Sequence, residues 1–146
     1  MTETMDTRAA TPWYFWVVAV VGFLWNCVGG FDYTMSHFQG EAYLRSGGMG
    51  DAQIAYMAAY PVWMHAVWAT GVWGAVAGSV LLLLRMRWAF HAFVLSTLGA
   101  GGSLAYTLLT PGGAKTMGGI FPVVIVVICL FFVWFSQTMT KRGVLR

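Results

Sequence analysis

The sequence predicts an all-α membrane protein, an antiparallel bundle of four transmembrane helices. The first observation is four long apolar runs, at residues 13–33, 58–84, 88–109 and 120–139. Each run approaches or exceeds the ~20 residues that a helix needs to cross a ~30 Å hydrocarbon core. The second observation is composition: 59% of the residues are hydrophobic and 9% are charged, against about 25% charged residues in soluble domains. Backbone polar groups in hydrocarbon must be bonded within their own segment, so these runs are expected to be helices within a single membrane domain, residues 1–146.

The distribution of basic residues predicts the orientation. An even number of spans puts both termini on one side of the membrane. That side carries six Lys and Arg residues, Arg8, Arg85, Arg87, Lys141, Arg142 and Arg146, against two in the other loops, Arg45 and Lys115. By the positive-inside rule, both termini are expected in the cytoplasm. The first run is expected to persist as a helix and not to be a cleaved signal peptide, because Glu3 and Asp6 precede it and no small-residue cleavage pattern follows.

The connections between the runs are unequal in length. Residues 34–57 form the longest loop, and Asp51 is a plausible N-cap for a short interfacial helix that leads toward Pro61 as a bend. Residues 85–87 alone join the second and third runs, which requires an antiparallel hairpin. Residues 110–119 are rich in Gly and include a Pro, so they are expected to form a turn-rich outer loop.

Small residues at helical spacing mark the expected helix contacts. Lipid tails do not drive helices together, so contacts form where small side chains permit close approach. The candidate packing residues on the first three runs are Gly22, Gly29, Gly74, Gly78, Gly99 and Ser103. The last run has no such stripe and is expected to be peripheral. The alternative to a functional interface is that these stripes only pack the bundle.

Polar residues at membrane depth suggest a candidate polar outer site, because such residues are costly unless they are bonded or functional. Its members are Asn26, Asp32, His65, His37 and Glu41. They could converge, with Asn26 at the floor and His37 and Glu41 at the rim. The alternative is structural: Asn26 bonds a neighbouring helix and Asp32 caps the loop.

No catalytic, metal or cofactor motif accompanies these residues. Asp32, His37 and His65 have metal-compatible chemistry but no ligand spacing. His65 and His91 differ in depth by roughly 25 Å at ~1.5 Å per residue, so they cannot share a haem. Cys27 and Cys129 are expected to be buried thiols that behave as small hydrophobes. We therefore expect no enzyme activity, no metal and no cofactor.

Several segments resemble a family of small four-span bacterial inner-membrane proteins. They are residues 25–35, which contain the pattern W-N-x-x-G-x-x-D-Y, together with residues 60–63, 78–85 and 88–89. The resemblance covers nearly the whole chain. Most members of that family are described as uncharacterised, and some carry an automatic sugar-transporter label. The resemblance implies a multi-pass protein of the bacterial inner membrane, with one recurrent design that includes Asn26, Gly29, Asp32, Tyr60 and Pro61.

Two functions follow as hypotheses. The first is a non-catalytic accessory or interaction subunit of a membrane complex, which suits the compact loops and the one-sided small faces. The alternative is a small oligomeric transporter or permease-like protein for a polar solute such as a sugar, although no carboxylate lies near the midplane to couple protons. The expected partners are the lipid bilayer and a homo-oligomer or larger membrane complex, without nucleic acid.

Overall fold

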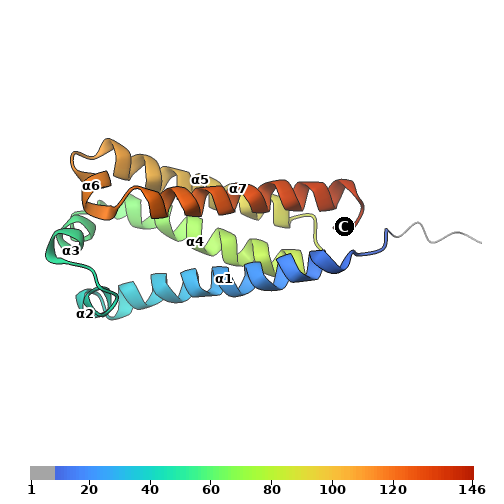
Figure 1. The fold of residues 1–146 in the computed structure, drawn as a ribbon, viewed down its shortest axis with the longest axis horizontal. Coiled ribbons are helices and arrows are strands. Elements are labelled where there is room, and N and C mark those ends of the chain that lie inside the picture. The colour runs from blue at the N-terminus through green and yellow to red at the C-terminus, as the bar shows by residue number, and fades with distance from the viewer. Residues whose placement is uncertain (1–8) are drawn as a thin grey trace, which may run out of the picture.

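All the regular secondary structure in residues 9–146, the part that this computed structural model describes, is helical (Figure 1). Four of the helices are long and apolar enough to cross a membrane: α1 (Trp13–Phe38), α4 (Val62–Leu83), α5 (Ala89–Leu109) and α7 (Ile120–Lys141). Three short helices lie in the connections: α2 (Glu41–Ser46), α3 (Asp51–Ala58) and α6 (Gly113–Met117). Glu3, Asp6 and Arg8, which enter the orientation and signal-peptide arguments, lie outside the described residues.

The long helices pack in the order α1, α4, α5, α7, with each helix resting on the next. The start of α1 and the C-terminus lie at one end of the bundle, which we call the terminal end (Figure 1). There Arg142 Nη1 donates a hydrogen bond of 2.7 Å to the Tyr14 hydroxyl. The opposite end carries α2, α3 and α6, and we call it the distal end.

The end of α1 and the start of α4 lie several residues later than the sequence predicts. α1 continues to Phe38, beyond the end of the apolar run, and within this polar stretch the side chains of Thr34 and His37 bond carbonyls of the preceding turn. His37 therefore lies in the last turn of α1 and not in a loop. α4 begins at Val62, after Pro61, because proline has no N–H to donate within a helix.

The first residue of α3 corrects a predicted cap. Asp51 is the first helical residue, and Gly50 occupies the N-cap position. The Gly50 N–H donates to the Gln53 side-chain oxygen at 3.0 Å. The Asp51 carboxylate does not cap the helix and instead pairs with Arg45 at 2.7 Å.

The core is concentrated in the terminal half of the bundle, and α7 contributes to it. Phe15 of α1 stacks on Phe135 with ring centroids 6.0 Å apart, and Phe93 of α5 stacks on Phe132 at 5.0 Å. Met139 is also buried there. The last helix lies at the edge of the packing order and has no small-residue stripe, and it contributes large aromatic side chains to this core.

The C-terminal residues 144–146 close the terminal end. Gly143 adopts a left-handed conformation with φ 71°, and the Val144 N–H donates to the Met139 carbonyl at 2.9 Å, which forms a Schellman motif. Arg146 then exchanges backbone hydrogen bonds with the α4–α5 turn, to the Arg85 carbonyl at 2.8 Å and from the Arg87 N–H at 2.7 Å. Val144 and Leu145 are consequently buried in the core.

Small residues bring α4 and α5 into backbone contact. A Cβ placed on Gly99 would meet the backbone nitrogen of Gly71, and one on Gly74 would lie 3.1 Å from the backbone nitrogen of Ser96. Ser96 donates a hydrogen bond of 2.6 Å to the Gly71 carbonyl at the same contact. Gly78 differs, because it faces the ring of Phe93, 2.8 Å from a built Cβ.

Candidate functional site: a cavity in the distal half

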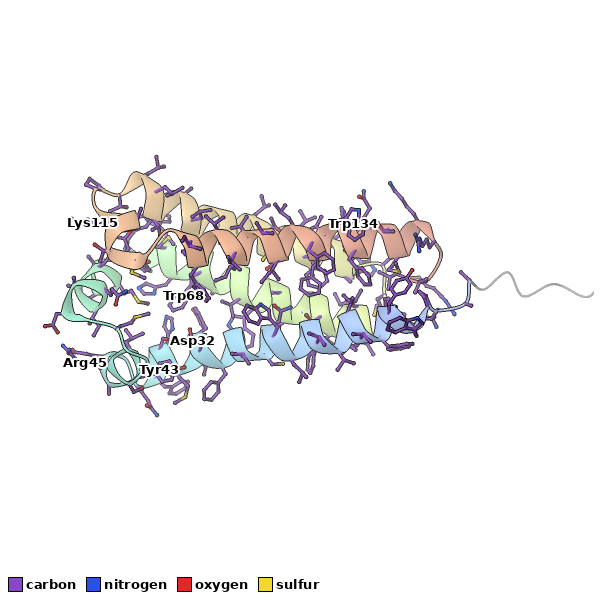
Figure 2. The ribbon with its side chains drawn as sticks, viewed as in Figure 1. Asp32, Tyr43, Arg45, Trp68, Lys115 and Trp134 are labelled. Atoms are coloured by element: carbon purple, nitrogen blue, oxygen red, sulfur yellow. The ribbon has the colours of Figure 1, made fainter. Side chains whose placement is uncertain are left out.

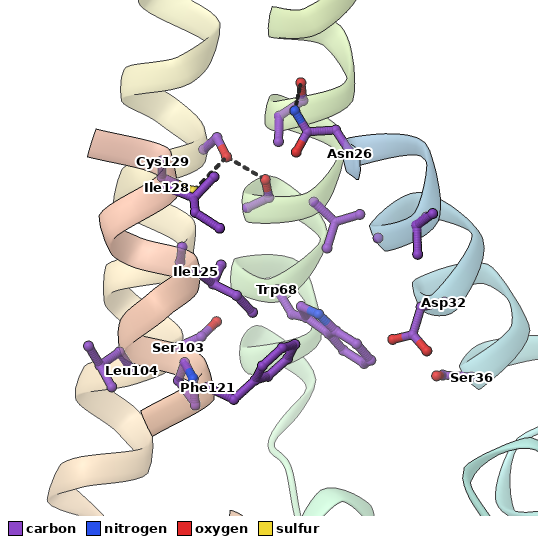
Figure 3. A pocket seen from close by; sticks show the side chains of 18 of the residues that line it. Asn26, Asp32, Ser36, Trp68, Ser103, Leu104, Phe121, Ile125, Ile128 and Cys129 are labelled. Carbon is purple, nitrogen blue, oxygen red and sulfur yellow. Dashed lines mark hydrogen bonds between the residues drawn. The ribbon is translucent and has the colours of Figure 1, made fainter. Parts of the chain in front are cut away.

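A cavity of about 580 Å³ occupies the distal half of the bundle. We call it the distal cavity. α1 and α7 form its two walls, α4 and α5 form its floor, and residues of α2, α3 and α6 line its distal end (Figure 3). Its lining is mainly apolar and includes the side chains of Met64, Val72, Leu104, Phe121, Ile125 and Ile128.

The cavity exists because large side chains join α1 and α7 only near the terminal end. Gly22 faces the ring of Phe132, whose nearest atom is 2.5 Å from a Cβ built on Gly22. Gly29 lies about two helical turns further along the same stripe of α1. A Cβ on Gly29 would meet no atom within 4 Å, and Gly29 lines the cavity. The two helices therefore converge toward the terminal end and separate toward α2 and α3 (Figure 1).

Asn26 lies at the terminal end of this space and joins α1 to α4. Its amide donates to the Ser79 hydroxyl at 2.6 Å and to the Ala75 carbonyl at 3.4 Å. Ser79 in turn donates to the Ala75 carbonyl at 2.9 Å. Asn26 is 9% exposed, so the structure places it in an interhelical bond while its side chain still borders the cavity.

Asp32 brings a carboxylate to the α1 wall of the cavity (Figures 2 and 3). The Tyr43 hydroxyl of α2 donates a hydrogen bond of 3.0 Å to Asp32 Oδ1. That hydrogen bond to a carboxylate raises the pKa of Tyr43, because it stabilises the protonated phenol. Asp32 thus connects the end of α1 to α2.

Aromatic rings and free hydroxyls complete the polar part of the lining. Trp68 of α4 projects toward the α1 wall near Asp32 (Figure 3). Tyr60 borders the cavity before α4 begins, and burial raises its pKa to about 12. The hydroxyls of Ser36 and Ser103 are buried without a hydrogen-bond partner in the described part of the chain. Ser103, a predicted packing residue, therefore carries a buried hydroxyl without a partner next to the cavity.

The predicted polar residues do not all meet at one place. His37 and His65 lie together, with ring centroids 5.4 Å apart, and His37 lies 5.5 Å from Trp68. Neither histidine is among the residues that line the cavity. Glu41 also lies outside the cavity lining and accepts from Arg45 at 2.7 Å.

Cys27 and Cys129 are both free thiols. Cys129 borders the cavity, with its sulfur 3.9 Å from the Ser96 hydroxyl. Within residues 9–146, no group of three or more His, Cys, Asp or Glu side chains is placed to hold a metal ion.

Sequence reasoning missed Tyr43, Trp68 and the two free serines. Tyr43 belongs to α2, a helix of six residues that carries no periodic signal of its own. Trp68 lies in an apolar run, and the sequence of such a run does not show whether a tryptophan faces lipid or the interior of the bundle.

This architecture, four apolar helices of spanning length around a cavity, is that of a multi-pass α-helical membrane protein. No protein-family model, no curated protein and no solved structure matches the chain.

Proposed function

We propose that this protein is a non-catalytic accessory subunit of a membrane complex that holds a lipid-like molecule in its distal cavity. The observation that carries the proposal is the cavity itself. Its volume of about 580 Å³ falls within the roughly 300–1,000 Å³ of small-molecule sites, which combine an apolar lining with a few polar groups. Asp32, Ser36 and Ser103 are among those polar groups, and most of the remaining lining is apolar.

The proposed setting is a bacterial inner membrane with both termini in the cytoplasm. The excess of Lys and Arg in the segments at the terminal end supports this orientation. The distal end then faces outward, α3 lies at the membrane interface, and the cavity lies in the outer half of the bilayer. The bacterial setting rests on the resemblance of residues 25–35 to four-span inner-membrane proteins.

The proposed partner is a larger membrane protein, bound through the lipid-facing surface of the bundle. Large apolar side chains such as Val21, Leu98 and Trp134 are exposed around that surface. A permease for a sugar receives less support, because a sugar path would have to continue through the stacked rings of Phe15, Phe93, Phe132 and Phe135.

Binding of the uncharged fluorescent probe N-phenyl-1-naphthylamine to the purified protein tests the ligand site. Gly29→Phe should fill the cavity without a backbone clash, because a Cβ at Gly29 meets no atom within 4 Å, and should lower probe binding. Gly101→Phe is the matched control: the position is equally open but does not line the cavity. Equal binding by both variants and the unmodified protein would rule out the cavity as the site.

Purification in mild detergent tests the accessory role. A larger protein that stays bound, and is lost when the lipid-facing surface is altered, supports it. A homo-oligomer that retains a polar solute would support the permease instead.

A further inference from the structure

We infer that the distal cavity selects a lipophilic cation, an apolar body bearing one ammonium-like or phosphonium-like charge, and that the Asp32 carboxylate is the group that selects it. This inference rests on the proposed function, because it names the class of molecule that the cavity would hold.

The charge of the lining is the first observation. Asp32 is the one Asp, Glu, Lys or Arg residue among the described residues that line the cavity. Arg45, the basic residue of the same connection, does not line it and instead pairs with Glu41 and Asp51, each at 2.7 Å. The lining therefore carries a single negative charge beside apolar surface, which complements a single positive charge on an apolar body.

The hydrogen-bonding state of the carboxylate is the second observation. Within residues 9–146, the Tyr43 hydroxyl is the one group that hydrogen-bonds Asp32, and it uses Oδ1. Oδ2 remains as an acceptor for a cation or its N–H group. Charge-assisted pairs of this kind are about twice as strong as neutral hydrogen bonds.

Aromatic rings beside the carboxylate are the third observation. Trp68 projects toward Asp32 across the cavity (Figure 3), and Tyr43 and Tyr60 also line it. The quadrupole of such rings attracts a cation that lies over the ring face, most strongly in Trp. A phospholipid headgroup fits less well, because its phosphate would meet no Lys or Arg among the described lining residues.

Two ions of the same shape and opposite charge test the inference. Tetraphenylphosphonium and tetraphenylborate would each compete with N-phenyl-1-naphthylamine for the full-length protein in uncharged micelles, with partition into empty micelles subtracted. We expect the cation to displace the probe at about tenfold lower concentration, equivalent to about 1.4 kcal/mol.

Asp32→Asn should bring the two ions to similar displacement, since it removes the charge but keeps an acceptor for Tyr43. Asp51→Asn is the matched control: its carboxylate is 86% exposed, lies in the same connection and does not line the cavity. That variant should retain the preference for the cation. Equal displacement in the unmodified protein, or an equal loss in both variants, would overturn the inference.

The same experiment separates the two proposals. Probe binding that is insensitive to Gly29→Phe defeats the proposed ligand site. Probe binding that Gly29→Phe lowers, but that both ions displace alike, leaves the site standing and defeats only the charge selection. Displacement by added phosphatidylethanolamine as strong as that by tetraphenylphosphonium would show a lipid headgroup as the occupant and would also overturn the inference.

Discussion

At the scale of single residues, Asn26 illustrates how one polar group positions a helix. Its amide donates hydrogen bonds to the Ser79 hydroxyl and the Ala75 carbonyl. The bond joins α1 to α4 between the terminal core and the cavity. Depth alone identified Asn26 in the sequence, whereas its partner Ser79 required the packing of α1 on α4.

Asn26→Leu should lower the free energy of unfolding by about 0.6–2 kcal/mol, the range for interhelical hydrogen bonds in membranes. Ser79→Ala made in the Asn26→Leu background should cost much less than Ser79→Ala alone, because the shared bond is already lost. Thermal unfolding in detergent measures the stability of the unmodified protein, the two single variants and the double variant. Strictly additive effects would show that the two side chains act independently.

Gly99 and Gly101 lie on the same helix in opposite environments. Gly99→Ala should lower the free energy of unfolding by about 1–3 kcal/mol, because its methyl group would overlap the backbone of Gly71. Gly101→Ala should be neutral or stabilise by up to about 1 kcal/mol, since its Cβ meets no atom and Ala favours the helix. A similar loss in both variants would mean that helix propensity, and not the α4–α5 contact, governs these positions.

At the scale of elements, the short segment after α7 has a larger role than its length indicates. Val144 is 2% exposed and Leu145 3% exposed, although Lys141, Arg142 and Gly143 precede them in a polar stretch. The sequence carries one signal for this arrangement, a Gly directly followed by apolar residues after a helix. That pattern is typical of a Schellman motif with its apolar contact.

Leu145→Asp should lower the free energy of unfolding by at least about 2 kcal/mol, because it removes a buried apolar side chain and places a carboxylate in the core. Arg146→Ala should change it by less than about 0.5 kcal/mol, since Arg146 holds the α4–α5 turn through its backbone and its side chain is exposed. Chemical unfolding of both variants provides the comparison. A stable Leu145→Asp protein would show that the tail does not contribute to the terminal core.

The ends of α1 and α3 show where element prediction fails. Hydrophobicity predicts that the first helix ends at residue 33, whereas α1 continues through a polar turn to Phe38. For α3, residue type favoured Asp51 as the cap, but the Gln53 side chain bonds Gly50. In both places the boundary lies among polar residues, and the apolar pattern of the sequence does not describe them.

At the scale of the whole molecule, orientation is a separate prediction. A reporter fused after Arg146 should be cytoplasmic, and one inserted between Gly47 and Gly48, exposed residues between α2 and α3, should lie outside. Paired phosphatase and fluorescent-protein fusions measure each position. A C-terminus outside the cytoplasm would reverse the proposed leaflet of the cavity.

The sequence predicts the four long helices well, because span length and composition leave few alternatives in hydrocarbon. It predicts the cavity poorly. Gly22 and Gly29 occupy the same stripe of α1, yet one meets the ring of Phe132 and the other faces open space. That difference depends on where α7 places its aromatic residues, and helical periodicity within one segment contains no information about a neighbouring helix.

The convergence of α1 and α7 at one end has a mechanical consequence. Beyond Asn26, α1 continues for residues 27–38, about 18 Å at 1.5 Å per residue. It is held there against α4 by contacts such as that between Tyr33 and Trp68. A tilt of about 10° around Asn26 would move the tip of such a lever by about 3 Å. The distal cavity would thereby accommodate ligands of different width, while the stacked aromatic rings near the terminal end stayed in contact.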